Sequence, residues 1–347
     1  MRCLGEGVKV ATIKDVALLA GVAVSTASAA INRSAPVSED VIARVAAAVK
    51  QIGYVPHGGA RSLRMGQSRL VGLILPDITN PHFANVARVV ESVCLAAGYM
   101  CAVYSTEENY DQERQILKMM RMQRVEGLII IPTRSDAEHG ARLLDQIHVP
   151  TILLDSFVDG LPYDVVKLDN VAAGRIGTEH LISLGHTRIA VTTGRDNIAT
   201  GEDRLAGYLQ AHAAHGLSVD RNLFLPGRFD QAQARASTLK RMAEADPPTA
   251  IFALSNMMTL GVLYALHDLK LKVPRDVSVL GIDDFDFANI MNPPPTVVAA
   301  PVLDMAKSAI SLLLAEIKQK SPPTAARTLF EPRLVLRDSC RAVAGGQ

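Results

Sequence analysis

The sequence predicts an all-α helix-turn-helix head at the N-terminus, followed by an α/β body of two lobes, each a doubly wound parallel sheet. Three short helical patterns open the chain and predict the head. From about residue 68, short apolar runs alternate with helical stretches, which is typical of parallel α/β sheets. This alternation occurs in two successive series, so the 347 residues are assigned to one small domain and two lobes.

The head is predicted from helical periodicity and its stop signals. Residues 13–20 place apolar side chains at i, i+3, i+4 and i+7. Gly21 ends this helix, because glycine enters the left-handed conformation of a tight turn at low cost. Helical spacing resumes at 25–32, and again at 39–52 after Ser38 as N-cap. Two helices joined by a three- to four-residue turn and supported by a third indicate a helix-turn-helix.

The body is predicted from short apolar runs that have the character of buried parallel strands. A last helix at 303–318 and a single strand at 328–337 complete it. The other strands are expected at 70–75, 100–104, 127–131 and 151–154 in the first lobe, and at 188–193, 224–227, 250–254 and 277–282 in the second.

Charge is distributed unevenly along the chain. Residues 1–69 contain nine basic and four acidic side chains, a formal charge of +5, whereas the other 278 residues contain 27 basic and 31 acidic, a formal charge of −4. A basic head on a mildly acidic body suggests a polyanionic partner at the N-terminal end. A solvated basic face is the alternative that charge alone leaves open.

Composition and motifs argue against several other classes of protein. No apolar run is long enough for a membrane span, and the first residues lack the apolar core of a signal peptide. The four cysteines have neither metal-type nor disulfide-framework spacing, so we expect reduced thiols in a cytoplasm. GxGxxG, Walker A, HExxH and GxSxG motifs are absent, and His212 with His215 is expected to be solvated on a helix. We therefore predict no enzyme, no cofactor and no metal site.

Polar side chains follow the predicted strands where they end. Because ligands of open α/β sheets bind beyond the carboxyl ends of strands, these side chains predict a cleft for a small polyhydroxylated ligand between the lobes. Arg204, Phe83 and Phe229 in similar loops would add a guanidinium fork and aromatic faces. The alternative is that acids at strand ends are turn and N-cap residues. The side chains at strand ends are Asp77, Asn80, Asp155, Asp169, Ser255, Asn256 and Asp283.

Ordered motifs run through nearly the whole chain. They begin with TIKDVALLAGVAVSTASAAIN at residue 12 and continue through ARSL and VGLILPDITNPHF to VPRDVSVLGIDDF and PRLVLRDS, covering about residues 12–340. This series resembles the lactose/galactose repressor (LacI/GalR) family of bacterial transcription regulators. The resemblance implies a periplasmic-binding-protein-like body behind a DNA-binding head.

The same resemblance implies a mechanism and partners. A homodimer would bind near-palindromic operator DNA, with the second helix of each head in the major groove. A hinge segment would insert Leu63 into the minor groove and bend the DNA, with Arg64 beside it. A small effector in the cleft, a sugar or sugar acid, would change DNA affinity allosterically. Such a regulator acts in the cytoplasm on the nucleoid and contacts no membrane.

Site residues are assigned from the resemblance position by position. Leu18 and Leu19 are expected to pack or to lie on the surface. Phosphate contacts are expected from Thr12, Thr26, Ser28 and Asn32, and base-edge contacts from Val24, Ser25 and Ala29. Effector contacts are expected from Asn80, His82, Phe83, Asp155, Arg204, Phe229, Ser255, Asn256 and Asp283.

The sequence departs from the family pattern at four places. Ala23 replaces the serine that caps the recognition helix, and Ala29 stands where a long, often basic side chain reads a base. Gly58 and Gly59 replace the alanine-rich start of the hinge helix, at a cost of about 0.5–1 kcal/mol each in a helix. Ala300 stands where a glutamine often faces the ligand, which leaves the identity of the ligand open.

The predicted function is a ligand-responsive DNA-binding repressor. A periplasmic-type binding protein without a DNA role and an α/β enzyme are the alternatives. The predicted segments are an extension (1–11), the helix-turn-helix domain (12–57), the hinge (58–68), the effector-binding and dimerisation domain (69–340, with its N-lobe at about 69–169 and 300–325 and its C-lobe at about 170–299 and 326–340) and a tail (341–347).

Overall fold

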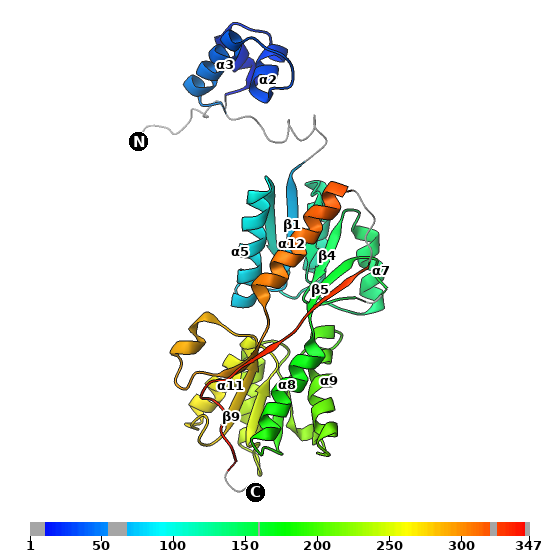
Figure 1. Cartoon of the computed structure of the whole chain (residues 1–347), viewed down its shortest axis with the longest axis vertical. Coiled ribbons are helices and arrows are strands. Elements are labelled where there is room, and N and C mark those ends of the chain that lie inside the picture. Colours follow the sequence, from blue (N-terminus) through cyan, green and yellow to red (C-terminus); the bar gives the residue numbers. More distant parts are fainter. Residues whose placement is uncertain (1–10, 55–67, 159, 320–324, 344–347) are drawn as a thin grey trace, which may run out of the picture. The chain divides into compact units, whose positions relative to one another are not determined.

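The structure is a computed structural model, which describes residues 11–54, 68–158, 160–319 and 325–343. The chain divides into two compact units, Met1–Ser68 and Arg69–Gln347 (Figure 1). We call them the head and the body.

The head consists of three short helices: α1 (Ile13–Ala20), α2 (Val24–Asn32) and α3 (Glu39–Ile52). The predicted helix-turn-helix is therefore confirmed. At the start of α1, Thr12 and Asp15 form a capping box, in which each side chain accepts a hydrogen bond from the other residue's backbone N–H. The core between the helices is made of alanine and valine side chains and one tyrosine; it comprises Val16, Ala17, Ala20, Ala27, Ala30, Val45, Ala48 and Tyr54.

The helix ends of the head differ in detail from the prediction. Gly21 adopts φ 64° and ends α1, as predicted. Ala23 occupies the N-cap of α2 and provides no side-chain acceptor, a loss of about 0.5–2 kcal/mol relative to a capping serine. Ser38 occupies the N-cap of α3, but its side chain makes no capping hydrogen bond within the described residues. Ile42, an apolar residue of α3, is 38% exposed.

The N-lobe of the body is a six-stranded parallel sheet in the order β11-β5-β4-β3-β1-β2. Helices α5 and α12 pack against each other on one face, and α6 and α7 cover an apolar layer on the other. The elements are β1 (Leu70–Leu75), α5 (Pro81–Ala96), β2 (Met100–Ser105), α6 (Tyr110–Met122), β3 (Gly127–Ile130), α7 (Ala137–Gln146), β4 (Thr151–Leu154), β5 (Asp164–Leu168), α12 (Val302–Gln319) and β11 (Arg327–Phe330).

The C-lobe repeats this plan with the strand order β12-β10-β9-β8-β6-β7. All strand pairs are parallel except that β12 runs antiparallel to β10. The elements are α8 (Asn170–Ser183), β6 (Ile189–Thr193), α9 (Ala199–Ala214), β7 (Phe224–Pro226), α10 (Gln231–Met242), β8 (Ala250–Ala253), α11 (Asn256–Asp268), β9 (Ser278–Ile282), β10 (Thr296–Ala299) and β12 (Arg333–Val335), with two short 3-10 helices at Arg221–Leu223 and Asp286–Ile290.

The prediction of a single strand at 328–337 is wrong. The ladder breaks at Glu331 and Pro332, and proline has no N–H to continue it. Strand β11 pairs with β5, whereas β12 pairs with β10. Residues 327–330 therefore belong to the N-lobe, not to the C-lobe to which 326–340 were assigned. The chain passes between the lobes three times, after β5, after β10 and between β11 and β12.

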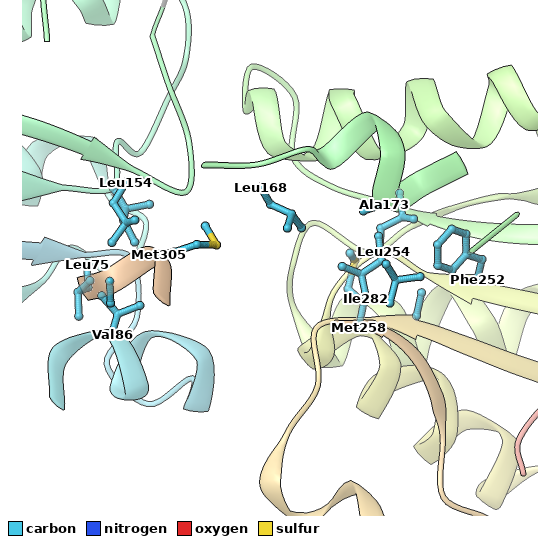
Figure 2. Close-up of a cluster of buried hydrophobic side chains, with 14 of the residues drawn as sticks. Leu75, Val86, Leu154, Leu168, Ala173, Phe252, Leu254, Met258, Ile282 and Met305 are labelled. Atoms are coloured by element: carbon cyan, nitrogen blue, oxygen red, sulfur yellow. The ribbon is translucent and has the colours of Figure 1, made fainter. Parts of the chain in front are cut away.

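Both lobes contribute to one continuous apolar core. Successive side chains of a strand alternate between its two faces, so Leu73 and Leu75 join the layer under α5 while Ile74 joins the layer under α6. Figure 2 shows this cluster, with Leu75 and Val86 on the N-lobe side and Phe252, Leu254 and Met258 among its C-lobe members. Because the core anchors the strands on both sides, the loops at their carboxyl ends are held in place.

The described residues were also compared with the requirements of a membrane-spanning helix and of a metal site. No single described helix combines the length and apolarity of a membrane span; only the bent pair of α1 and α2 passes that test, and by length and composition alone. Within the same residues, no group of three or more His, Cys, Asp or Glu side chains is arranged to hold a metal ion.

Candidate functional site

A cleft of about 700 Å³ lies between the two lobes at the carboxyl ends of their strands. The structure brings all nine predicted effector residues into its lining. Asn80, His82, Phe83 and Asp155 come from the N-lobe, and Arg204, Phe229, Ser255, Asn256 and Asp283 come from the C-lobe.

Two aspartates and a histidine form the buried centre of the cleft. Asp155 directly follows β4 and Asp283 directly follows β9, and both adopt left-handed backbone conformations with φ of 63° and 68°. Such a conformation costs a non-glycine residue of order 1–3 kcal/mol, so the surrounding fold must hold it. His82 lies between the two carboxylates, with Nε2 4.0 Å from Asp155 Oδ1 and Nδ1 3.7 Å from Asp283 Oδ1.

Arg204 is fixed by three hydrogen bonds in the C-lobe. It lies on α9 and is 2% exposed. Nε donates to Asn170 Oδ1 at 2.9 Å, and one terminal nitrogen donates to the Leu254 carbonyl at 2.6 Å and to Asp283 Oδ2 at 3.3 Å. A guanidinium group held at three points is a rigid donor at the edge of the cleft.

Side chains from the two lobes also bond each other directly. Asn256 Nδ2 donates to Asn80 Oδ1 at 2.8 Å, so the two amides face each other across the cleft. The Asn80 oxygen also accepts the His82 backbone N–H at 3.0 Å, which caps α5. Thr200 Oγ1 donates to the Asp155 carbonyl at 3.1 Å. These bonds connect the two lobes across the cleft.

The mouth of the cleft contains an ion pair that sequence reasoning missed. Arg195, in the loop after β6, pairs with Glu108, in the loop after β2, and both line the cleft. Burial raises the pKa of the Glu108 carboxyl, while the Arg195 guanidinium acts to lower that pKa. Both residues follow strand ends, so the pattern that identified Asp155 could have identified them too.

Two other positions singled out in the sequence, Asp169 and Ala300, fall outside the cleft, whereas Asp77 lines it. Asp169 follows β5 but accepts the Ala172 N–H at 2.9 Å and caps α8, so for this residue the N-cap alternative is correct. Ala300 is not among the lining residues. Phe83 and Phe229 are in the lining, and the Phe83 ring meets the edge of the His82 ring at a centroid distance of 5.0 Å.

The predicted DNA-contacting residues of the head differ in how much surface they present. Thr12, Val24, Ser25 and Asn32 are exposed, Val24 at 43%. Thr26 and Ala29 are half-buried, and Ser28 is 8% exposed. Asn32 Nδ2 donates to the Ser28 carbonyl at 2.9 Å, so this amide is tied to its own helix. Leu18, expected to pack or to lie on the surface, is 84% exposed and Leu19 47%. Leu63 and Arg64 lie outside the described residues.

The two units match known protein families separately. Residues 12–57 match the family described as bacterial regulatory proteins, lacI family. Residues 178–340 match the periplasmic binding protein-like domain.

Known proteins are similar to this chain over almost their whole length. The chain is 33% identical over 333 residues to the HTH-type transcriptional repressor PurR of Photobacterium profundum, covering 95% of this chain and 99% of that protein. It is 33% identical over 309 residues to the ribose operon repressor of Escherichia coli, covering 89% and 94%. Among solved structures, the lac repressor dimer bound to operator and the anti-inducer ONPF has a TM-score of 0.83 at 25% identity, covering 96% of this chain and 100% of that one.

Proposed function

The chain belongs to the lacI family of bacterial regulatory proteins, and on this basis we propose the roles of its head and of its cleft in repression. The protein is a ligand-responsive, sequence-specific DNA-binding repressor that acts as a dimer. The observation that carries this function is the presence, in one chain, of a helix-turn-helix head and a polar cleft between two lobes. We assign 12–57 to DNA binding, 58–68 to the hinge and 69–340 to effector binding and dimerisation.

For DNA binding, we propose that α2 enters the major groove. Val24 is 43% exposed and suits the methyl group of a thymine, and Ser25 offers one hydroxyl. Ala29 offers almost no contact, so α2 makes few base-specific contacts in the major groove. More of the specificity would come from DNA deformation where Leu63 enters the minor groove, and from the spacing of the two heads.

For the effector, we propose a sugar-like molecule held by side chains of both lobes. Asp155 and Asp283 would accept its hydroxyl groups, Arg204 would donate to its oxygens, and Phe229 would cover an apolar face of the ring. Because the ligand contacts both lobes, its binding favours one lobe arrangement over another, which is the requirement for allosteric control of the heads.

We also propose that the chain binds its effector without converting it, and that it acts in the cytoplasm, where the operator is. The relatives compared are transcriptional repressors, which supports both proposals. The cleft aspartates and His82 are accounted for by ligand hydrogen bonding.

The function is tested with operator DNA selected from a library of near-palindromic sequences. For a protein with six to ten phosphate contacts, affinity falls by about 10³–10⁵ between 50 and 200 mM salt. We expect such a steep fall, and a further change of about 5- to 150-fold on addition of a ligand found by thermal-shift screening. Fluorescence anisotropy measures both. An affinity equal to that for scrambled DNA at every salt concentration would overturn the proposal.

The thin readout by α2 leads to a specific prediction. Ala29→Arg should place a guanidinium in the major groove, where a bidentate contact to guanine contributes about 1–3 kcal/mol of discrimination. We expect the selected operators to gain a preferred base pair in each half-site, measured by repeating the selection. Leu18→Arg adds the same charge on α1 and is the control. A base preference that is unchanged by Ala29→Arg contradicts the placement of α2 in the groove.

A further inference from the structure

We propose that the cleft selects a polyhydroxylated ligand without an anionic group and rejects sugar acids and sugar phosphates. This inference rests on the proposed function, because it concerns the effector of the same cleft. The sequence predicted either a sugar or a sugar acid as effector, and this inference selects the sugar.

The buried centre of the cleft needs hydrogen-bond donors from its ligand. Oδ1 of Asp283 is buried and has no hydrogen-bond partner among the described residues. The carboxylate of Asp155, a residue 9% exposed, has His82 as its described charged partner, at 4.0 Å, which is beyond hydrogen-bond range. Since a buried acceptor left without a donor is unfavourable, ligand hydroxyl groups would stabilise both carboxylates. A carboxylate or phosphate group brings only acceptors to this place.

The charges around the cleft also disfavour an anion. The lining contains six acidic side chains and three basic ones, a formal excess of three negative charges with His82 neutral and two with His82 protonated. The acidic residues are Asp77, Glu107, Glu108, Asp155, Asp230 and Asp283, and the basic ones are Arg195, Arg204 and Arg235. Two unit charges interact more strongly where protein replaces water, so this excess acts most on a ligand charge inside the cleft.

Each lining guanidinium group is already paired with a carboxylate. Arg204 is paired with Asp283 at 3.3 Å. At the mouth, Arg195 is paired with Glu108. Arg235 is paired with Asp268 at 2.6 Å. An anionic group would have to compete with one of these carboxylates, so the described cleft offers no ready counter-ion for it.

Helix N-termini offset only part of this excess. The start of α9 lies in the lining and has no side-chain cap from its N-cap residue, Ile198, among the described residues. A helix N-terminus carries the equivalent of about half a positive charge, so the four helix starts in the lining together contribute about two, against a formal acidic excess of three with His82 neutral. The starts of α5, α10 and α11 also line the cleft, and each is already capped by its own side-chain oxygen, from Asn80, Asp230 and Ser255.

The test compares neutral and anionic forms of the same carbon skeleton on the full-length chain. Ribose, glucose, galactose and cellobiose are screened beside ribonate, gluconate, galactonate, cellobionate, ribose 5-phosphate and glucose 6-phosphate, by thermal shift and then by calorimetry. We expect the strongest stabiliser to be neutral and its anionic counterparts to bind at least about tenfold more weakly. A sugar acid or sugar phosphate that binds more tightly than its neutral counterpart overturns the proposal.

Variants test whether the acidic residues cause the selectivity. Asp155→Asn keeps an acceptor but removes a charge, so we expect weaker binding of the neutral ligand and a smaller ratio of neutral to anionic affinity. Asp145→Asn makes the same change on an exposed position of α7 and should leave that ratio unchanged. An unchanged ratio in Asp155→Asn contradicts the argument. These measurements use no DNA, so they can fail without affecting the operator test. The operator test alone decides the proposed function.

Discussion

Gly174→Ala is expected to destabilise the C-lobe severely and to abolish the response to effector. Helices α8 and α9 approach so closely that a Cβ atom at Gly174 would lie 1.9 Å from the carbonyl oxygen of Arg204. The obstacle is backbone, so the helices must separate. Overpacking of this kind typically costs about 1–3 kcal/mol, occasionally more. The cost here should be at the upper end, because separation also displaces Arg204 from its hydrogen bonds to Asn170 and Leu254.

Urea unfolding followed by circular dichroism measures the loss of stability, and calorimetry with the best ligand measures the loss of binding. Gln210→Ala, on an exposed position of the same α9, is the control and should change stability by less than about 0.5 kcal/mol. A Gly174→Ala variant with the stability and ligand affinity of the original chain would contradict the close approach of the two helices.

Arg204→Ala should have an effect of similar size for a different reason. Removing this side chain leaves Asp283 buried without its cationic partner, and breaking a buried ion pair costs about 3–5 kcal/mol. Arg204 is therefore expected to support the C-lobe as well as to contact the ligand. The response to effector should be lost. Operator affinity depends on the head, so the folded fraction of Arg204→Ala should still bind the operator.

The control for Arg204→Ala is Arg175→Ala. Arg175 pairs with Glu179 one turn along α8 at 3.1 Å, and both side chains are substantially exposed. Surface pairs of this kind contribute about 0–1 kcal/mol. Arg204→Lys keeps the positive charge but lacks the planar guanidinium fork. It therefore distinguishes the effect of the charge on folding from the effect of the fork on ligand recognition. If Arg204→Ala binds the ligand as tightly as the original chain, the assignment of this residue to the effector site is wrong.

Local sequence patterns predicted the helices well because the signals that define them are local. The bounds of α1 and α3 agree with the prediction because apolar spacing, the capping box at Thr12 and the glycines at 21 and 53 act within a few residues. The end of the chain was harder, since an apolar pattern at 328–337 does not indicate that its two halves pair with different sheets.

The same limit applies to the cleft. Asp155 and Asp169 both follow apolar strands, but Asp169 leads directly into α8 and caps it, whereas Asp155 turns in a left-handed conformation beside the cleft. The next residues along the backbone, not the strand itself, decide which role the carboxylate takes. The pairing of Glu108 with Arg195 joins loops 87 residues apart, a distance at which the local pattern contains no signal.

The late position of the two edge strands has a consequence for biosynthesis. Strands β11 and β12 complete one sheet each, and only two residues separate them. A ribosome makes the chain from its N-terminus, so the three helices of the head emerge about 275 residues before β11, counted from Ile52 to Arg327. During that interval a nascent chain carries a complete DNA-reading module on a body whose sheets both lack an edge strand. Both lobes are therefore completed together, once β12 has been made, and effector control of the head begins only then.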